Sequence, residues 1–140
     1  MSIPVLVLLA FAGWTLLSMS LTVGVYRWSR IFSGRNRIGE FSEYRIEGQD
    51  WYKRALRAHA NCVENLPVYG AVVLAIVATG AQSPLLDNLA LVFLIARLAQ
   101  TSVHVGFQHS DWAATVRFSL FFVQLVCTIW MGLYVVIEAS

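Results

Sequence analysis

Four long apolar segments follow one another along the chain, and polar or charged residues separate them. The segments are residues 4–27, 54–79, 85–107 and 112–138. A hydrocarbon layer of roughly 30 Å requires about 20 apolar residues per helix, so each segment is long enough to cross a bilayer. The pattern predicts an all-α membrane protein, a bundle of four transmembrane helices that forms a single domain over residues 1–140.

The composition agrees with this prediction and excludes other classes of protein. Of the 140 residues, 58% are hydrophobic and 13% are charged, which is too apolar for an ordinary soluble domain. The net charge of +2 is small, and the basic residues do not form a stripe, so we expect no nucleic-acid partner. Cys62 and Cys127 lie inside apolar segments, at a spacing that favours neither a disulfide framework nor a metal site.

The basic residues predict an orientation in the membrane. Seven of the ten lie in or beside the first connection, namely Arg27, Arg30, Arg35, Arg37, Arg45, Lys53 and Arg54. Because cytoplasmic loops are enriched in Lys and Arg, we expect the 29–53 loop to be cytoplasmic and both termini to lie on the opposite side. This loop, which mixes charges with aromatic residues, either covers a cytoplasmic-facing site or is a solvated loop whose charges neutralise one another.

Polar side chains inside three of the apolar segments fall at helical spacing. The second segment has Arg57, Asn61 and Glu64 within about 60° of one another around a helix. In the third segment the stripe consists of Arg97, Gln100, Thr101 and His104. In the fourth segment it consists of Arg117, Phe121 and Gln124. Ionisable groups inside a membrane are costly unless they face the bundle interior or a wet cavity, so these residues are candidates for a functional site.

Two interpretations of these stripes are open. In the first, Glu64 pairs with Arg97 inside the bundle and fixes the register of the helices without any ligand. In the second, the remaining groups form a cationic pocket, weighted toward the cytoplasmic half, that suits a small anionic molecule. Arg57 also fits a third role, because an Arg near a helix end commonly extends to the lipid headgroups.

The segment from Arg57 to Pro67 resembles the signature of the MAPEG family, the membrane-associated proteins of eicosanoid and glutathione metabolism. The shared core is Arg-x-x-x-Asn-x-x-Glu followed closely by Pro on the second of four helices. The resemblance covers essentially the whole chain and is nearest to bacterial-type microsomal glutathione transferases. It implies a homotrimer of four-helix subunits in a bacterial inner membrane, with glutathione bound between neighbouring subunits in the cytoplasmic half.

The resemblance also implies roles for individual residues. Arg117 corresponds to the catalytic Arg that is assigned to the thiol. The positions that bind glutathione correspond to Arg27, Arg57, Asn61, Glu64 and Arg97, with His104 as a further hydrogen-bond donor. Several family members have His and Tyr where this chain has Gln100 and His104. These departures affect the choice of electrophile.

The chemistry of glutathione agrees with this allocation. The molecule has two carboxylates, one ammonium and one thiol, so it requires several cations, one anion and neutral donors. Arginine recognises carboxylates through its planar fork, and Glu64 suits the ammonium. A fixed guanidinium beside the sulfur favours thiolate, which is the reactive form, so we expect Arg117 to act as an electrostatic stabiliser rather than as a base.

We therefore expect a membrane enzyme that conjugates glutathione to lipophilic electrophiles, with reduction of lipid hydroperoxides as an additional activity. The second substrate would enter from the membrane lipids. One alternative is a noncatalytic lipid-binding or scaffold protein of the same fold. Another is a small proton-coupled exporter in which Glu64 exchanges a proton for a cationic drug, and this alternative requires an accessible, unpaired carboxylate.

Overall fold

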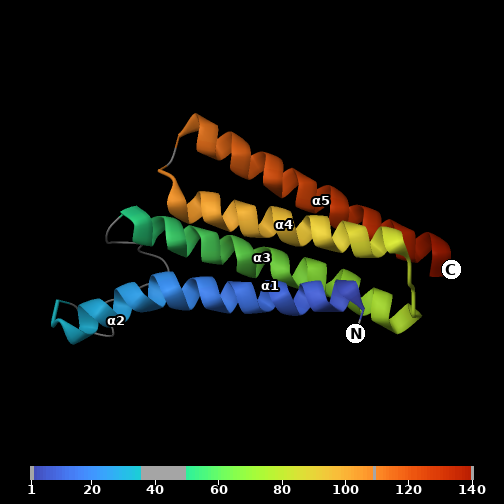
Figure 1. Ribbon diagram of the computed structural model, residues 1–140, viewed down its shortest axis with the longest axis horizontal. Helices are drawn as coiled ribbons and strands as arrows, with labels where there is room; N and C mark the ends of the chain where they lie inside the picture. The colour runs from blue at the N-terminus through green and yellow to red at the C-terminus, as the bar shows by residue number, and fades with distance from the viewer. Residues whose placement is uncertain (1, 36–49, 109, 140) are drawn as a thin grey trace.

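The computed structural model describes residues 2–35, 50–108 and 110–139, and the chain in these ranges is helical (Figure 1). The elements are α1 (Ile3–Met19), η1 (Ser20–Gly24), α2 (Val25–Phe32), α3 (Asp50–Thr79), α4 (Pro84–Gly106) and α5 (Asp111–Ala139). Within these described ranges, four helices are long and apolar enough to cross a membrane: Ile3–Phe32, Trp51–Thr79, Pro84–Gly106 and Asp111–Glu138. The predicted all-α membrane fold with four spanning helices is thus confirmed. The question of whether the first connection covers a site concerns residues 36–49, which lie outside the described ranges.

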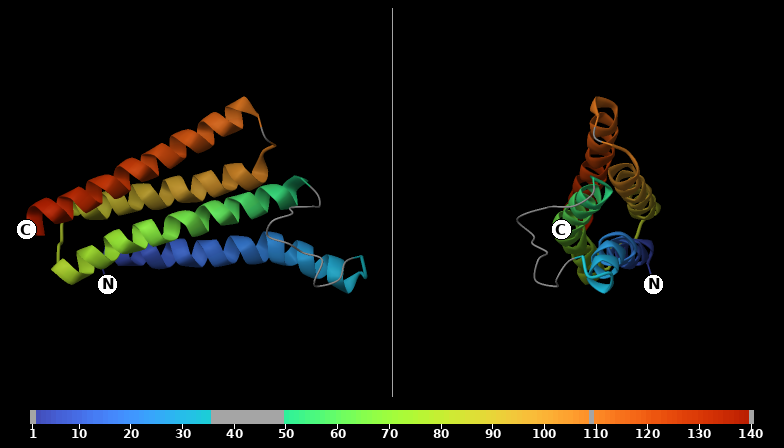
Figure 2. Two further views of the ribbon diagram at one scale, coloured as in Figure 1. Left: turned by 180° about the vertical axis from the view of Figure 1, so that it is seen from behind. Right: turned by 90° about the vertical axis from the view of Figure 1, so that its left-hand side faces the viewer.

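The helices run antiparallel, so that both termini and the turn at Gly80 lie at one end of the bundle (Figure 1). The α4–α5 turn and the start of α3 lie at the other end. α4 pairs with α5, while α1 packs against both α3 and α4. α4 and α5 lie close together near the C-terminus and diverge as they approach the turn that joins them, as both side-on views show (Figures 1 and 2).

Local sequence signals set the ends of the helices. Ser83 caps α4 by accepting a hydrogen bond from the Leu85 amide at 3.1 Å, and Pro84 occupies the first turn, where its missing N–H is no loss. Gly80 has a φ of +69°, a left-handed conformation that ends α3 and that glycine adopts without strain. α3 begins at Asp50, before the predicted residue 54. Its polar first turn is anchored because Nε of Arg54 donates to the Val105 carbonyl at 3.2 Å.

The first membrane helix is longer and less regular than its sequence predicts. It continues beyond the expected residue 27 to Phe32, and residues Ser20–Gly24 form a π-helical turn between α1 and α2. Just beyond this turn, Tyr26 stacks on Tyr52 of α3 with ring centroids 4.0 Å apart. These rings belong to a small buried cluster that attaches the end of the first helix to the start of α3.

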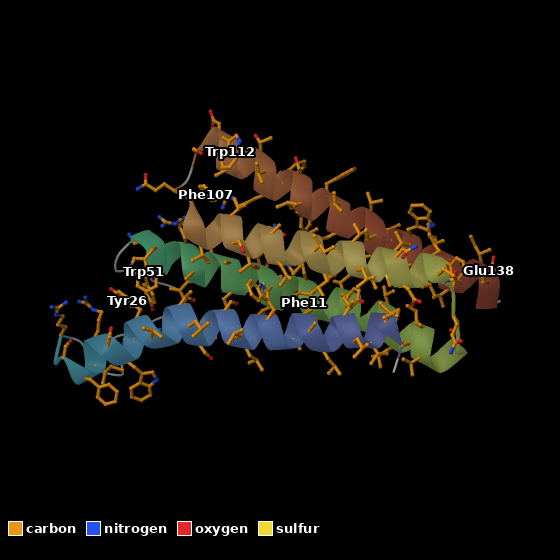
Figure 3. The ribbon with its side chains drawn as sticks, viewed as in Figure 1. Phe11, Tyr26, Trp51, Phe107, Trp112 and Glu138 are labelled. Carbon is orange, nitrogen blue, oxygen red and sulfur yellow. The ribbon has the colours of Figure 1, made fainter. Side chains whose placement is uncertain are left out.

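The main core lies toward the end of the bundle that holds the termini. Phe11 of α1 is fully buried in this core (Figure 3). Its ring centroid lies 5.6 Å from that of Phe93 in α4, and Phe93 stacks on Tyr69 of α3 with centroids 4.4 Å apart. The Tyr69 hydroxyl donates to the Pro4 carbonyl at 3.0 Å, so the buried phenol is satisfied. Large apolar side chains also cover the outside of the bundle, among them Leu16, Leu74, Ile95 and Ile137. Such a surface requires lipid or another subunit as its surroundings.

Candidate functional site

A pocket of about 410 Å³ opens between α3, α4 and α5, in the half of the bundle that contains the α4–α5 turn. Its volume falls within the range of small-molecule sites, roughly 300–1,000 Å³. The lining residues are Asn61, Glu64, Asn65, Gln100, His104, Ala114, Arg117, Phe118 and Phe121. Four of the seven residues that the sequence predicts for the site thus meet here: Asn61, Glu64, His104 and Arg117.

Arg117 presents its guanidinium to this pocket from the second turn of α5. Its Nη1 lies 3.0 Å from Nε2 of His104 on α4, and its Nε donates to the Ala113 carbonyl at 3.4 Å. The two contacts hold the half-buried guanidinium from two different helices. Phe121, one turn further along α5, lines the same pocket, as the predicted stripe requires.

α3 contributes a carboxylate and two amides to the opposite wall. Glu64 is exposed and lines the pocket, and within the described part of the chain it has no ion-pair partner. The side-chain amide of Asn65 donates to the Asn61 carbonyl at 2.7 Å, which links two successive turns of the helix. The pocket therefore combines one open carboxylate with one guanidinium and with neutral amide groups.

Arg97 lies apart from this lining and is almost completely buried, with 1% of its surface exposed. Its Nη1 donates to the Asn61 carbonyl at 3.4 Å, and its Nη2 donates to the side-chain oxygens of Asn61 and Gln100. The guanidinium also lies over the ring of Phe11, 5.7 Å from its centroid. The predicted pairing of Arg97 with Glu64 is therefore wrong, because neutral oxygens one turn earlier on α3 satisfy this cation.

Gln124 extends the same network from α5. Its Nε2 donates to Oε1 of Gln100 at 2.6 Å and to the Leu120 carbonyl at 3.1 Å. Three helices are thus connected by side-chain amides around one buried cation. These hydrogen bonds across three helices restrain how the helices are rotated against each other, so this part of the predicted stripes has a structural role. Two buried atoms of the network, Nε of Arg97 and Oε1 of Gln124, have no partner among the described residues.

Arg27 and Arg57 lie in a second pocket of about 380 Å³, between α3 and the first helix. The remaining lining residues are Met19, Leu56, His59, Ala60 and Val63. Nε of Arg27 donates to the Tyr52 hydroxyl at 2.8 Å, which places this arginine against the start of α3. Although Arg57 was predicted on one stripe with Asn61 and Glu64, within one subunit it lines a different pocket from theirs.

Some lining residues were not among the predicted site residues. Asn65 repeats the amide of Asn61 after four residues, a spacing that could have identified it as part of the same face. Ala114 and Phe118 have no such signal, because small and aromatic residues are common throughout a membrane helix. Only the position of α5 beside α3 and α4 brings them to the pocket.

Comparisons with known proteins were made for the whole chain. A model of the MAPEG family matches residues 4–137, a span that includes both pockets and every residue predicted for the site. Neither the curated proteins nor the solved structures gave a match.

Proposed function

The chain belongs to the MAPEG family, and we propose that it is a membrane glutathione transferase that conjugates glutathione to lipophilic electrophiles, with lipid hydroperoxides as further substrates. The family includes glutathione transferases and also noncatalytic members, so membership leaves the activity open. The observation that supports catalysis is the guanidinium of Arg117, held by His104 at the wall of a pocket that also contains the open carboxylate of Glu64.

The side chains present fit the groups of glutathione. Glu64 would receive the ammonium, and the amides of Asn61 and Asn65 offer neutral hydrogen bonds nearby. Two carboxylates require further cations, which Arg27 and Arg57 supply in the second pocket. We propose that the protein is a homotrimer in which Arg27 of a neighbouring subunit closes the first pocket, because within one subunit Arg27 lines a different pocket from Arg117.

Glutathione would supply the nucleophile, the thiolate form of its cysteine. The role of Arg117 is electrostatic, since a fixed guanidinium beside the sulfur favours thiolate over thiol. Preorganised charges of this kind are typically worth a factor of about 10²–10³ in turnover. Phe118 and Phe121 provide an apolar wall beside Arg117, and Phe118 is 69% exposed on the outside of α5. An electrophile dissolved in lipid can therefore approach from this side.

The location of the protein in the cell is also a proposal. The helices show a multi-pass membrane protein with both termini at the same end. The seven basic residues in and beside the 29–53 loop support a cytoplasmic position for the opposite end of the bundle, where α3 begins. Both pockets lie toward this end, which would give them access to cytoplasmic glutathione. We propose a bacterial inner membrane as the setting.

Binding and turnover together test this proposal. The protein in lipid nanodiscs should bind glutathione in calorimetric titration and should conjugate it to an aromatic halide. The Arg57→Ala variant should bind more weakly, whereas Glu138→Gln, which changes an exposed carboxylate at the far end of α5, should bind as the wild type does. Failure of the intact protein to bind glutathione would refute the proposal.

The second candidate function, a proton-coupled exporter, is favoured by one observation. Glu64 is exposed and has no ion-pair partner among the described residues, as an exchanging carboxylate requires. Efflux of a cationic dye from reconstituted vesicles that Glu64→Gln abolishes would support this function. The surplus of guanidinium groups around the two pockets favours an anionic ligand instead, so we rank transferase activity first.

The departures at Gln100 and His104 favour a third candidate, a noncatalytic member of the family. Gln100 is bound to Arg97 and Gln124, so it takes part in the structural network instead of standing free at the wall. Glutathione binding without any conjugation of the aromatic halide or reduction of a hydroperoxide would support a binding or scaffold role.

A further inference from the structure

The contact between Arg117 and His104 determines the protonation state of the imidazole. Nη1 of Arg117 lies 3.0 Å from Nε2 of His104. A guanidinium has donors and no acceptor, so a hydrogen bond at this distance requires a lone pair on Nε2. The imidazole is therefore neutral and has its proton on Nδ1, because the partner of one ring nitrogen selects the tautomer.

The charges around His104 agree with a neutral ring. Among the described residues, three cations act on the ring, Arg117 on α5, Arg57 on α3 and Arg97 on its own helix, and one carboxylate, Glu64 of α3, lines the same pocket. Nδ1 of His104 is buried and has no hydrogen-bond partner among the described residues. A proton added to Nε2 would place two cations in direct contact, with no described carboxylate at the other ring nitrogen to stabilise the imidazolium.

We infer that His104 is the positioning residue for Arg117, holding the guanidinium at the pocket wall through its neutral Nε2 and releasing it when the imidazole is protonated. The inference rests on the proposed function in one respect, namely that Arg117 stabilises the thiolate. In the neutral state the guanidinium is held by His104 and by the Ala113 carbonyl. Protonation of the imidazole replaces the first contact by repulsion between two cations.

Histidine at this position gives the chain a property that tyrosine would not. A phenol oxygen accepts a hydrogen bond throughout the neutral range, because tyrosine ionises only near pH ~10. An imidazole stops accepting as soon as it is protonated. The positioning of Arg117, and with it the stabilisation of the thiolate, is therefore acid-sensitive in this protein.

The first test measures the tautomer directly and needs no glutathione. The ¹⁵N shifts of the histidine side chains are recorded in nanodiscs at neutral pH, and the signal that disappears in His104→Gln is assigned to His104. We expect an unprotonated Nε2 and a protonated Nδ1, and Arg117→Ala should change the Nε2 shift. A proton on Nε2 of the wild type, either in the other tautomer or in the imidazolium, would overturn the inference.

The second test compares pH profiles of kcat/KM for the conjugation reaction. His104→Leu removes the acceptor and should lower kcat/KM about tenfold at neutral pH, the loss expected for one charged hydrogen bond. His104→Gln keeps an acceptor oxygen that does not titrate, so it should stay within about threefold of the wild type. It should also lack the additional loss of activity toward acid pH. The control is Ser119→Ala on the exposed face of α5, where the hydroxyl donates only to the Thr115 carbonyl.

The outcomes separate this inference from the proposed function. Suppose that the wild type is active. If His104→Leu has the same rate as the wild type, or if His104→Gln is equally sensitive to acid, the inference is overturned and the proposed function stands. A wild type that binds no glutathione overturns the function. In that case the nitrogen shifts still decide whether His104 holds Arg117.

Discussion

Two arginines inside the bundle, Arg97 and Arg117, have the same charge in opposite surroundings. Arg97 is 1% exposed, donates to oxygens of Asn61 and Gln100, and lies over an aromatic ring. Arg117 is half-buried at the wall of a pocket, where the imidazole of His104 contacts its guanidinium. The first cation is enclosed by the protein, whereas the second is turned toward a space that a ligand can enter.

The difference shows how a membrane protein can keep one cation for structure and another for chemistry. Amide oxygens of the protein replace the hydration of Arg97 from two helices, so its guanidinium connects helices and has no surface for a substrate. Arg117 lies at the pocket wall, and its contact with the neutral imidazole of His104 does not cancel its positive charge.

Replacement of Arg97 should damage the fold. Arg97→Leu removes the buried guanidinium that donates to oxygens of Asn61 and Gln100, and we expect a loss of about 3 kcal/mol in the free energy of unfolding. Arg97→Lys, which keeps the charge with fewer donors, should be intermediate. Denaturant unfolding followed by circular dichroism in detergent measures both variants. The matched change Arg117→Leu should cost less than about 1 kcal/mol, and equal losses at the two sites would remove the distinction.

Replacement of Arg117 should instead damage the reaction. Arg117→Ala removes the cation proposed to stabilise the thiolate, and we expect turnover of an aromatic halide to fall about 100-fold, equivalent to about 2.7 kcal/mol. Arg117→Lys should recover part of this loss, because it retains a positive charge. Steady-state kinetics at saturating glutathione give the result. A variant that turns over at the wild-type rate would remove Arg117 from the mechanism.

Glu64 should affect binding and not stability. Glu64→Gln exchanges a charged acceptor for a neutral one, so the dissociation constant for glutathione should rise about tenfold, or about 1.4 kcal/mol. The free energy of unfolding should be unchanged, since Glu64 is exposed and has no ion-pair partner among the described residues. Calorimetry and unfolding of the same preparation test both statements. A marked loss of stability would mean that Glu64 has the structural role predicted from the sequence.

The smallest effect is expected at the outer member of the Arg97 network. Gln124→Leu removes the 2.6 Å hydrogen bond to Gln100, but it also removes a buried oxygen that has no partner among the described residues. The two changes oppose each other, so we expect a loss of only about 1 kcal/mol in unfolding free energy and normal turnover. If turnover falls more than stability, the network and the pocket are not separate.

Apolar length was enough to predict the four helices, because a bilayer requires about 20 apolar residues per span. Helical spacing was enough to find the polar faces of three helices, and four residues predicted from these faces, Asn61, Glu64, His104 and Arg117, line the same pocket. These predictions concern each helix by itself. The π-helical turn at Ser20–Gly24 had no signal that we recognised in the sequence.

The partners between helices could not be predicted in the same way. Whether Arg97 meets Asn61 or Glu64 depends on how far α4 is shifted along α3, and a shift of one turn, about 5.4 Å, exchanges the two. Spacing within a helix has no information about this offset. The same reason applies to Arg57, which lies on the predicted stripe but is exposed and lines the pocket beside the first helix.

Arg117 is proposed to stabilise the thiolate form of bound glutathione, and ultraviolet difference absorbance detects that thiolate directly. Addition of glutathione to the wild type in nanodiscs at neutral pH should produce the absorbance of a thiolate. Arg117→Ala should lose most of this signal while calorimetry still shows bound glutathione. A variant with the full thiolate signal, or a wild type that binds glutathione without any such signal, would contradict the account.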